Sequence, residues 1–128
     1  MIFNETNIKL EEMMVSLQPL LQRRDKLGYI AARNTRAITN VIKDFVDFRY
    51  ELVKEYGQPE LDDKGNPTGR TFVSESDPKF NEFYTKLHEI GDIKQEVDLM
   101  TLEYDEVVGV LSGEEIFQLD WMLVDQEV

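Results

Sequence analysis

Residues 29–56, YIAARNTRAITNVIKDFVDFRYELVKEY, decide the fold that this sequence can adopt. Their apolar side chains recur at intervals of three and four residues, and polar or charged side chains fill the other positions. This pattern predicts an amphipathic helix of about 28 residues, roughly 40 Å long, which Gly57 and Pro59 should end. The apolar positions are Ile30, Ala37, Ile38, Val41, Ile42, Phe45, Phe48, Leu52 and Tyr56.

The segment before this helix predicts a second, shorter helix. Apolar residues return at helical spacing from about Lys9 onward, and Pro19 lies inside the run. Because proline removes a backbone donor and crowds the preceding turn, we expect a kink or a break there. Gly28 is expected to adopt a left-handed conformation in the turn that follows. Residues 1–8 are expected to be extended or disordered.

After the central helix, turn-forming residues alternate with short elements. Residues 58–71 are rich in Asp, Asn, Gly and Pro, which predicts an exposed loop or loose hairpin leading into a short strand at 70–73. Asp77 and Pro78 are typical of a helix start, and Gly91 of its end. Residues 95–104 alternate imperfectly and predict a strand. Ser112 with Glu115 forms a capping box that opens a short terminal helix.

Together these elements predict an α+β domain dominated by helices. Its parts are the long central helix, an N-terminal helical hairpin, a small β-hairpin or two-stranded sheet, and two shorter helices. The 128 residues are 41% hydrophobic and include seven Phe, five Tyr and one Trp. That is enough for one core and too short for two ordinary domains, so we predict a single domain, 1–128.

The sequence offers few side chains for catalysis. It has no cysteine, and its one histidine, His88, is predicted to be a surface or boundary residue. No Gly-x-Ser-x-Gly elbow and no glycine-rich phosphate-binding fingerprint is present. Asp62 and Asp63 lie in a loop, but the spacing of residues 62–66 does not fit a calcium-binding loop. We therefore expect no enzymatic activity, no cofactor and no bound metal.

Charge is distributed unevenly along the chain. The net charge is −12, yet residues 23–43 hold six basic side chains against one acidic, whereas residues 57–128 hold 18 acidic against five basic. This basic strip either pairs with acids of the C-terminal half, the interpretation that we favour, or contacts an anionic partner. The acidic half either keeps the protein soluble or competes with nucleic acid for a basic protein. Direct nucleic-acid binding is disfavoured, because the net charge repels phosphates.

Candidate partner-binding residues come from both charged regions and from the apolar C-terminus. Trp121 and the apolar residues after it belong either to the core or to an exposed anchor for a partner or for self-association. Arg33 or Arg36 is expected to pair with a C-terminal acid, and Asn34 to bond a backbone group of the leading segment. The full set of candidates is Arg33, Arg36, Asp98, Glu103, Asp105, Glu106 and Trp121.

Several short motifs occur in an order that suggests a family. Residues 26–36 read KLGYIAARNTR, residues 51–57 read ELVKEYG, and residues 62–67 read DDKGNP. Phe80, Glu82 and Leu87 follow, and then residues 96–98, which read EVD. Over residues 8–123 this order resembles a family of small acidic proteins of unknown function from tailed phages and prophages of Gram-positive and gut bacteria. The resemblance implies a phage origin and assigns no role to single residues.

These observations favour a binding protein over an enzyme. We expect a phage accessory protein that contacts another protein, inhibiting a host defence or nucleic-acid-handling protein through its acidic surface. The alternative is a component of head or tail assembly, and self-association stays open. No apolar run reaches the roughly 20 residues of a bilayer span. Residues 1–12 do not read as a signal peptide. We therefore expect a location in the host cytoplasm, or in the virion, and no membrane contact.

Overall fold

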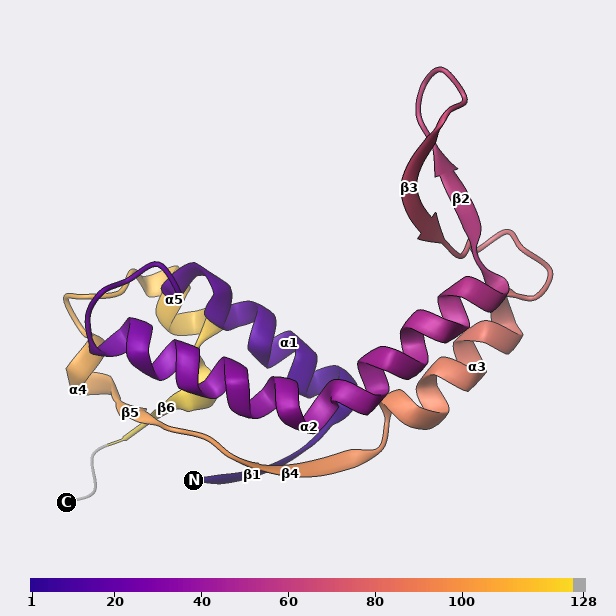
Figure 1. The fold of residues 1–128 in the computed structure, drawn as a ribbon. Helices are drawn as coiled ribbons and strands as arrows, with labels where there is room; N and C mark the ends of the chain where they lie inside the picture. Colours follow the sequence, from indigo (N-terminus) through magenta and orange to yellow (C-terminus); the bar gives the residue numbers. More distant parts are fainter. Residues whose placement is uncertain (126–128) are drawn as a thin grey trace. The chain divides into compact units, whose positions relative to one another are not determined.

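Helix α2, Lys26–Tyr56, is the longest element of the computed structural model, which describes residues 1–125 (Figure 1). It contains the whole predicted central helix and stops just before Gly57, whose N–H still donates to the Val53 carbonyl at 2.7 Å. Besides α2, the described residues form shorter helices and two-stranded sheets. The fold is therefore α+β and dominated by helices, as predicted.

The chain groups into two compact units. Unit 1 contains Met1–Ile42 and Lys94–Val128, the latter described as far as residue 125, and unit 2 contains Lys43–Ile93. Helix α2 contributes its first part to unit 1 and the rest to unit 2. None of the helices in residues 1–125 combines the length and apolar character that crossing a bilayer requires.

In unit 1, helix α1, Asn7–Leu17, precedes α2 and forms the predicted helical hairpin with it (Figure 1). Thr6 caps α1, because its hydroxyl accepts a hydrogen bond from the Lys9 N–H at 3.1 Å. The 3₁₀ turn η1, Gln18–Leu20, follows and contains Pro19. The predicted break at Pro19 is confirmed.

Gly28 corrects one prediction. It lies inside the first turn of α2 and is not among the glycines with positive φ, so it makes no left-handed turn. A Cβ at this position would lie 2.0 Å from the Arg23 carbonyl oxygen. Glycine is needed here because the chain entering α2 passes too close for any side chain, and not because of its φ angle.

Unit 1 also contains two small two-stranded sheets. Strand β1, Ile2–Thr6, pairs antiparallel with β4, Lys94–Asp98, so the predicted extended start is confirmed for these residues. Strand β5, Leu102–Glu103, pairs in parallel with β6, Leu123–Val124. The strand predicted at 95–104 is thus divided into β4 and β5. Helix α4, Tyr104–Val107, begins at residue 104, the last residue of the predicted strand. The break falls at Met100, whose backbone is hydrogen-bonded to the side chain of Asn34.

The C-terminal part of unit 1 begins with the predicted capping box. The Ser112 hydroxyl accepts from the Glu115 N–H at 3.1 Å, and the Glu115 carboxylate accepts from the Ser112 N–H at 3.0 Å. Helix α5, Gly113–Gln118, follows, and then the 3₁₀ turn η2, Asp120–Met122. Fully buried apolar side chains from α1, α2 and this segment form the core of unit 1; among them are Leu10, Leu17, Ile30, Ile38, Leu119 and Met122.

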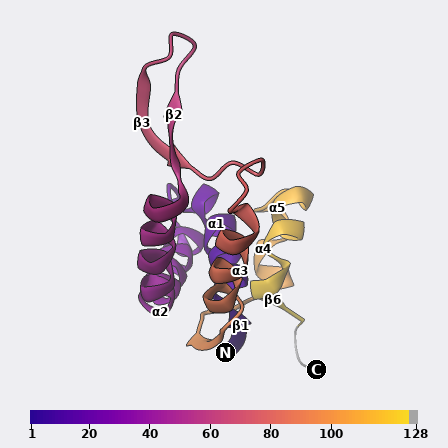
Figure 2. The ribbon, with the colours of Figure 1, turned by 90° about the vertical axis from the view of Figure 1, so that its right-hand side faces the viewer.

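Unit 2 contains the end of α2, a hairpin and one further helix. Strands β2, Gln58–Leu61, and β3, Pro67–Phe72, pair antiparallel, and Gly65 with φ +81° lies in the turn between them. Figures 1 and 2 show this hairpin extending away from the helices of its unit, in agreement with the exposed segment predicted at 58–71. The buried apolar side chains of unit 2 are Phe45, Leu52 and Phe83, which come from α2 and from the segment 80–91.

Helix α3, Phe80–Gly91, begins later than predicted. Asp77 does not cap it; its carboxylate accepts from the Lys79 N–H at 2.8 Å, and its carbonyl accepts from the Phe80 N–H at 3.0 Å. These two bonds form a separate turn, so the first helical residue is Phe80. The predicted end at Gly91 is confirmed.

Candidate binding surfaces

A row of exposed residues follows one side of α2 in unit 1. Lys26, Tyr29, Arg33, Arg36 and Asn40 recur at intervals of three and four residues and are all exposed; we call them the α2 stripe. The Arg33 guanidinium carbon lies 6.0 Å from the centre of the Tyr29 ring, and Arg33 Nη1 lies 3.4 Å from the Tyr29 hydroxyl. The stripe therefore presents three positive charges and one aromatic ring to solvent.

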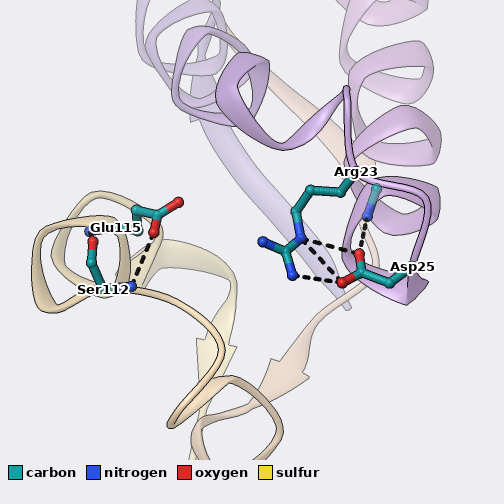
Figure 3. Close-up of polar contacts among 5 residues, drawn as sticks. Arg23, Asp25, Ser112 and Glu115 are labelled. Atoms are coloured by element: carbon teal, nitrogen blue, oxygen red, sulfur yellow. Dashed lines mark hydrogen bonds and ion pairs between the residues drawn. The ribbon is translucent and has the colours of Figure 1, made fainter.

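The predicted internal pairing of the basic strip is only partly present. Lys26 Nζ lies 2.7 Å from Glu106 Oε1, which joins α2 to α4. Arg23 pairs with Asp25 in the turn before α2, with Nη2 and Oδ2 2.6 Å apart, and Glu115 stands opposite (Figure 3). Arg33 and Arg36 form no ion pair with any described acid, so their expected C-terminal partners are not found within residues 1–125.

These ion pairs shift the pKa values of the acids involved. The Lys26 hydrogen bond, helped by one from the Glu103 N–H, lowers the pKa of Glu106. The Arg23 hydrogen bond, with further help from the Gly28 N–H, lowers the pKa of Asp25. Both carboxylates are therefore held in their charged form by neighbours inside unit 1.

Residues 94–125 form a strongly acidic segment, with nine acids and a single base, Lys94. Some of these acids have structural roles. Besides Glu106 and Glu115, Asp98 lies 2.9 Å from the Met1 amine, and Asp120 accepts from the Tyr104 hydroxyl, a bond that raises the pKa of Tyr104. The exposed acids without a hydrogen bond or ion pair to any described residue are Glu96, Asp105, Glu114 and Asp125.

Trp121, predicted as a partner contact, has contacts inside unit 1. Its indole N–H donates to the Ser16 hydroxyl at 2.9 Å, and its ring meets the Phe3 ring edge-on with centroids 5.9 Å apart. The apolar residues beside it, Met122 and Leu123, are buried. The apolar C-terminus thus belongs largely to the core, the first of the two interpretations of the sequence.

The most exposed large apolar side chain of the acidic segment belongs to a residue that sequence reasoning missed. Phe117 on α5 is 82% exposed, more than any other large apolar side chain in residues 1–125. Glu114, three residues earlier on the same helix, shares its face. The neighbouring Gln118 lines a shallow groove of about 670 Å³ with Glu12, Val15 and Pro19. Helix α5 therefore carries the exposed Phe117 ring, the Glu114 carboxylate and, at Gln118, one side of this groove.

His88 lies at the edge of unit 2. Its Nδ1 is 3.2 Å from Asp92 Oδ1, and its ring centroid is 4.2 Å from that of Tyr84. Nearby, the Tyr56 hydroxyl donates to Glu82 at 2.7 Å and accepts from Lys86 at 2.9 Å. Within residues 1–125, no group of three or more His, Asp or Glu side chains is arranged to hold a metal ion. The two hydrogen bonds of the Tyr56 hydroxyl connect α3 to the end of α2.

Comparison with known proteins adds no relative. No protein-family model, curated protein or solved structure is similar to this chain at a level that shows a relationship. The resemblance to phage proteins therefore stays a prediction.

Proposed function

We propose that this protein acts by binding another protein through the acidic segment 94–125, with Phe117 as the apolar anchor. The observation that carries the proposal is the 82% exposure of the Phe117 ring on a helix that also presents Glu114. Burying such a ring against a partner stabilises a complex by about 1.5–3 kcal/mol. Aromatic anchors surrounded by polar groups are typical of binding hot spots.

The charges favour a basic protein as the partner. Four exposed acids of the segment have no partner among the described residues, and the whole chain carries −12. A field of this sign attracts a basic surface and raises its association rate. Proteins that handle nucleic acid carry such surfaces, and an acidic protein that covers one competes with the nucleic acid. The expected role of a phage accessory protein that inhibits a host protein is consistent with this chemistry.

A second candidate is assembly through contacts between copies. Unit 1 carries both the α2 stripe, which is positive, and the acidic segment, which is negative. Opposite charges within one unit allow Arg33 and Arg36 of one copy to meet the free acids of the next, a head-to-tail contact that suits the virion alternative. Sedimentation at low and high salt tests it. Association that disappears in high salt supports assembly, and a monomer at both salts contradicts it.

Affinity capture from a bacterial lysate with matched variants tests the main proposal. The first variant, Asp105→Asn with Glu114→Gln and Asp125→Asn, removes free acids, and the second, Phe117→Ser, removes the anchor. The control, Arg33→Gln with Arg36→Gln, neutralises the α2 stripe. We expect the captured protein to be retained by the wild type and the control, and lost with the other two. If the first variant still captures the partner and the control does not, the contact lies on the α2 stripe instead.

A further inference from the structure

Unit 1 contains a groove between helix α1 and helix α5. Its larger part has a volume of about 670 Å³ and continues past the end of α1 to Pro19. A smaller hollow of about 220 Å³ reaches Lys9 and Trp121. The residues common to both are Glu12, Ser16 and Gln118. The two hollows are therefore parts of one groove, which follows the chain from Lys9 to Pro19 over roughly 15 Å.

Two glutamine side chains from different elements line this groove. Gln18 belongs to η1 and Gln118 to α5; both are exposed, and neither side chain is hydrogen-bonded to a described residue. A glutamine amide has an acceptor oxygen and two donor hydrogens, so it can bond both the N–H and the carbonyl of an extended chain. The middle of a helix offers neither group, because its backbone bonds are made internally. The two amides therefore favour an extended ligand.

The apolar part of the groove is open to solvent. Val15 on α1 is 53% exposed, and Pro19 in η1 is exposed as well; both line the larger part. An aliphatic side chain of a ligand that covers them removes apolar surface from water, which favours the complex. The ligand is therefore expected to carry aliphatic side chains.

The charges beside the groove are negative. Glu114 lies one helical turn before Gln118 on α5, is exposed and has no partner among the described residues. Of the described residues that line the larger part, only Glu12 is charged; its Oε2 is 3.8 Å from Lys9 Nζ, so a ligand competes with Lys9 for it. The net charge of −12 has the same sign and repels acidic peptides and nucleic acid alike. Charge therefore favours a basic ligand.

We propose that this groove binds an extended basic segment of the partner protein, an inference that rests on the proposed function. The amides of Gln18 and Gln118 bond the backbone of the segment, an aliphatic side chain covers Val15, and a lysine or arginine side chain reaches Glu114. The length of the groove accommodates about four or five extended residues, at about 3.3 Å each. Phe117, which precedes Gln118 in the sequence, contacts the same partner outside the groove. The partner is thus recognised by a short stretch of chain as well as by its charge.

NMR titration of the full chain with a defined peptide tests the proposal. The probe is unlabelled acetyl-Lys-Leu-Lys-Leu-Lys-amide, and the comparison probes are its Glu-Leu and Ser-Leu analogues and a short oligothymidylate. Trp121 lines the smaller hollow and is the only tryptophan of the chain, so its indole N–H gives one identifiable signal there. We expect the Lys-Leu peptide to shift this signal and the side-chain amides of Gln18 and Gln118. This location matters because the net charge attracts a basic peptide to the whole molecule.

Matched substitutions test the parts of the groove separately. Gln18→Met and Gln118→Met keep the side-chain length but remove the hydrogen-bonding groups, and each is expected to weaken peptide binding by about three- to tenfold. Gln22→Met, at an exposed position outside the lining, is the control and should change it by less than about twofold. Lys9→Met removes the competing amine and should tighten binding by about threefold, whereas Lys94→Met, the same charge change on β4, should tighten it by less. Circular dichroism establishes that each variant is folded.

Several results would overturn the proposal. It is wrong if the Lys-Leu peptide does not bind, if Gln22→Met weakens binding as much as the two groove variants do, or if Lys94→Met tightens it as much as Lys9→Met. Equal or tighter binding of either analogue or of the oligothymidylate also overturns it, since the groove would then not select a basic segment. Sedimentation of the chain alone covers one further occupant: self-association that Gln118→Met abolishes would assign the groove to a second copy.

Affinity capture separates this proposal from the proposed function. Phe117 does not line the groove, so Phe117→Ser should release the captured partner and change the peptide affinity by less than about twofold. Full capture by Gln18→Met and Gln118→Met, together with lost peptide binding, would refute the groove as the site of the partner and leave the proposed function standing. Full capture by Phe117→Ser would refute the proposed function, and the peptide titrations would still decide which ligand the groove selects.

Discussion

Asn34 and Met100 are joined by two hydrogen bonds across 66 residues of sequence. The Asn34 side-chain amide donates to the Met100 carbonyl at 3.0 Å, and its oxygen accepts from the Met100 N–H at 2.8 Å. Asn34 is 1% exposed. Both backbone groups of Met100 are therefore satisfied by a side chain of α2 and not by a neighbouring strand. This explains why the extended segment after β4 is interrupted before β5 begins.

Asn34→Ala should lower the free energy of unfolding by about 2–3 kcal/mol, because it leaves the N–H and carbonyl of Met100 without partners. Asn40→Ala, at an exposed position of the same helix, is the matched control and should change stability by less than about 0.5 kcal/mol. Urea denaturation followed by circular dichroism measures both. Equal effects of the two substitutions would show that the Asn34 bonds do not hold this segment.

Gly28→Ala should destabilise the protein by about 1–3 kcal/mol, because the new Cβ would lie 2.0 Å from the Arg23 carbonyl. Gly113→Ala is the control, since a Cβ there meets nothing within 4 Å and alanine favours the helical conformation of α5. We expect that variant to be as stable as the wild type or slightly more stable. Thermal unfolding compares the two, and a neutral Gly28→Ala would contradict the close approach.

The Lys26–Glu106 contact predicts a pH dependence. The folded-state pKa of Glu106 is lowered, so the carboxylate stabilises the fold above its unfolded-state pKa, and this contribution is lost as the pH falls through the folded value. In Lys26→Met the pKa of Glu106 should rise, and the loss of stability on acidification should be smaller. Lys94→Met is the control and should leave Glu106 unchanged. NMR titration of the Glu106 carboxyl carbon reads both variants, and an unmoved pKa in Lys26→Met would refute the pair.

Substitutions of Trp121 and of Phe117 should have opposite effects: the first should lower stability, and the second should abolish partner binding. Trp121→Phe removes the indole N–H that reaches Ser16 and should cost about 1 kcal/mol of stability while partner capture persists. Phe117→Ser exposes no core residue and should leave stability nearly unchanged while capture is lost. Denaturation and affinity capture are measured on both variants. The opposite result, with capture lost in Trp121→Phe alone, would return the anchor role to Trp121.

The sequence predicted those elements whose physical cause is local. The amphipathic repeat of α2, the proline break after α1 and the Ser112–Glu115 capping box all depend on residues within a few positions of each other. The strand at 95–104 was predicted too long because its break depends on Asn34, a distant residue. Gly28 was assigned to a turn because its true constraint, the Arg23 carbonyl, is a matter of packing and not of backbone preference.

The candidate surfaces were only partly predictable for similar reasons. Composition located the acidic segment and the basic strip, but not which acids find partners within the fold. Phe117 was missed because α5 has six residues, too few for spacing to assign its faces.

Zero-length crosslinking of carboxylates to amines, read by mass spectrometry on the complex with the captured partner, is the most direct test of binding through the acidic segment. Asp105 and Glu114 are expected to become linked to lysines of the partner, and these links should disappear in high salt. Links that run instead from Lys26 of this chain to acids of the partner would place the contact on the α2 stripe and contradict it.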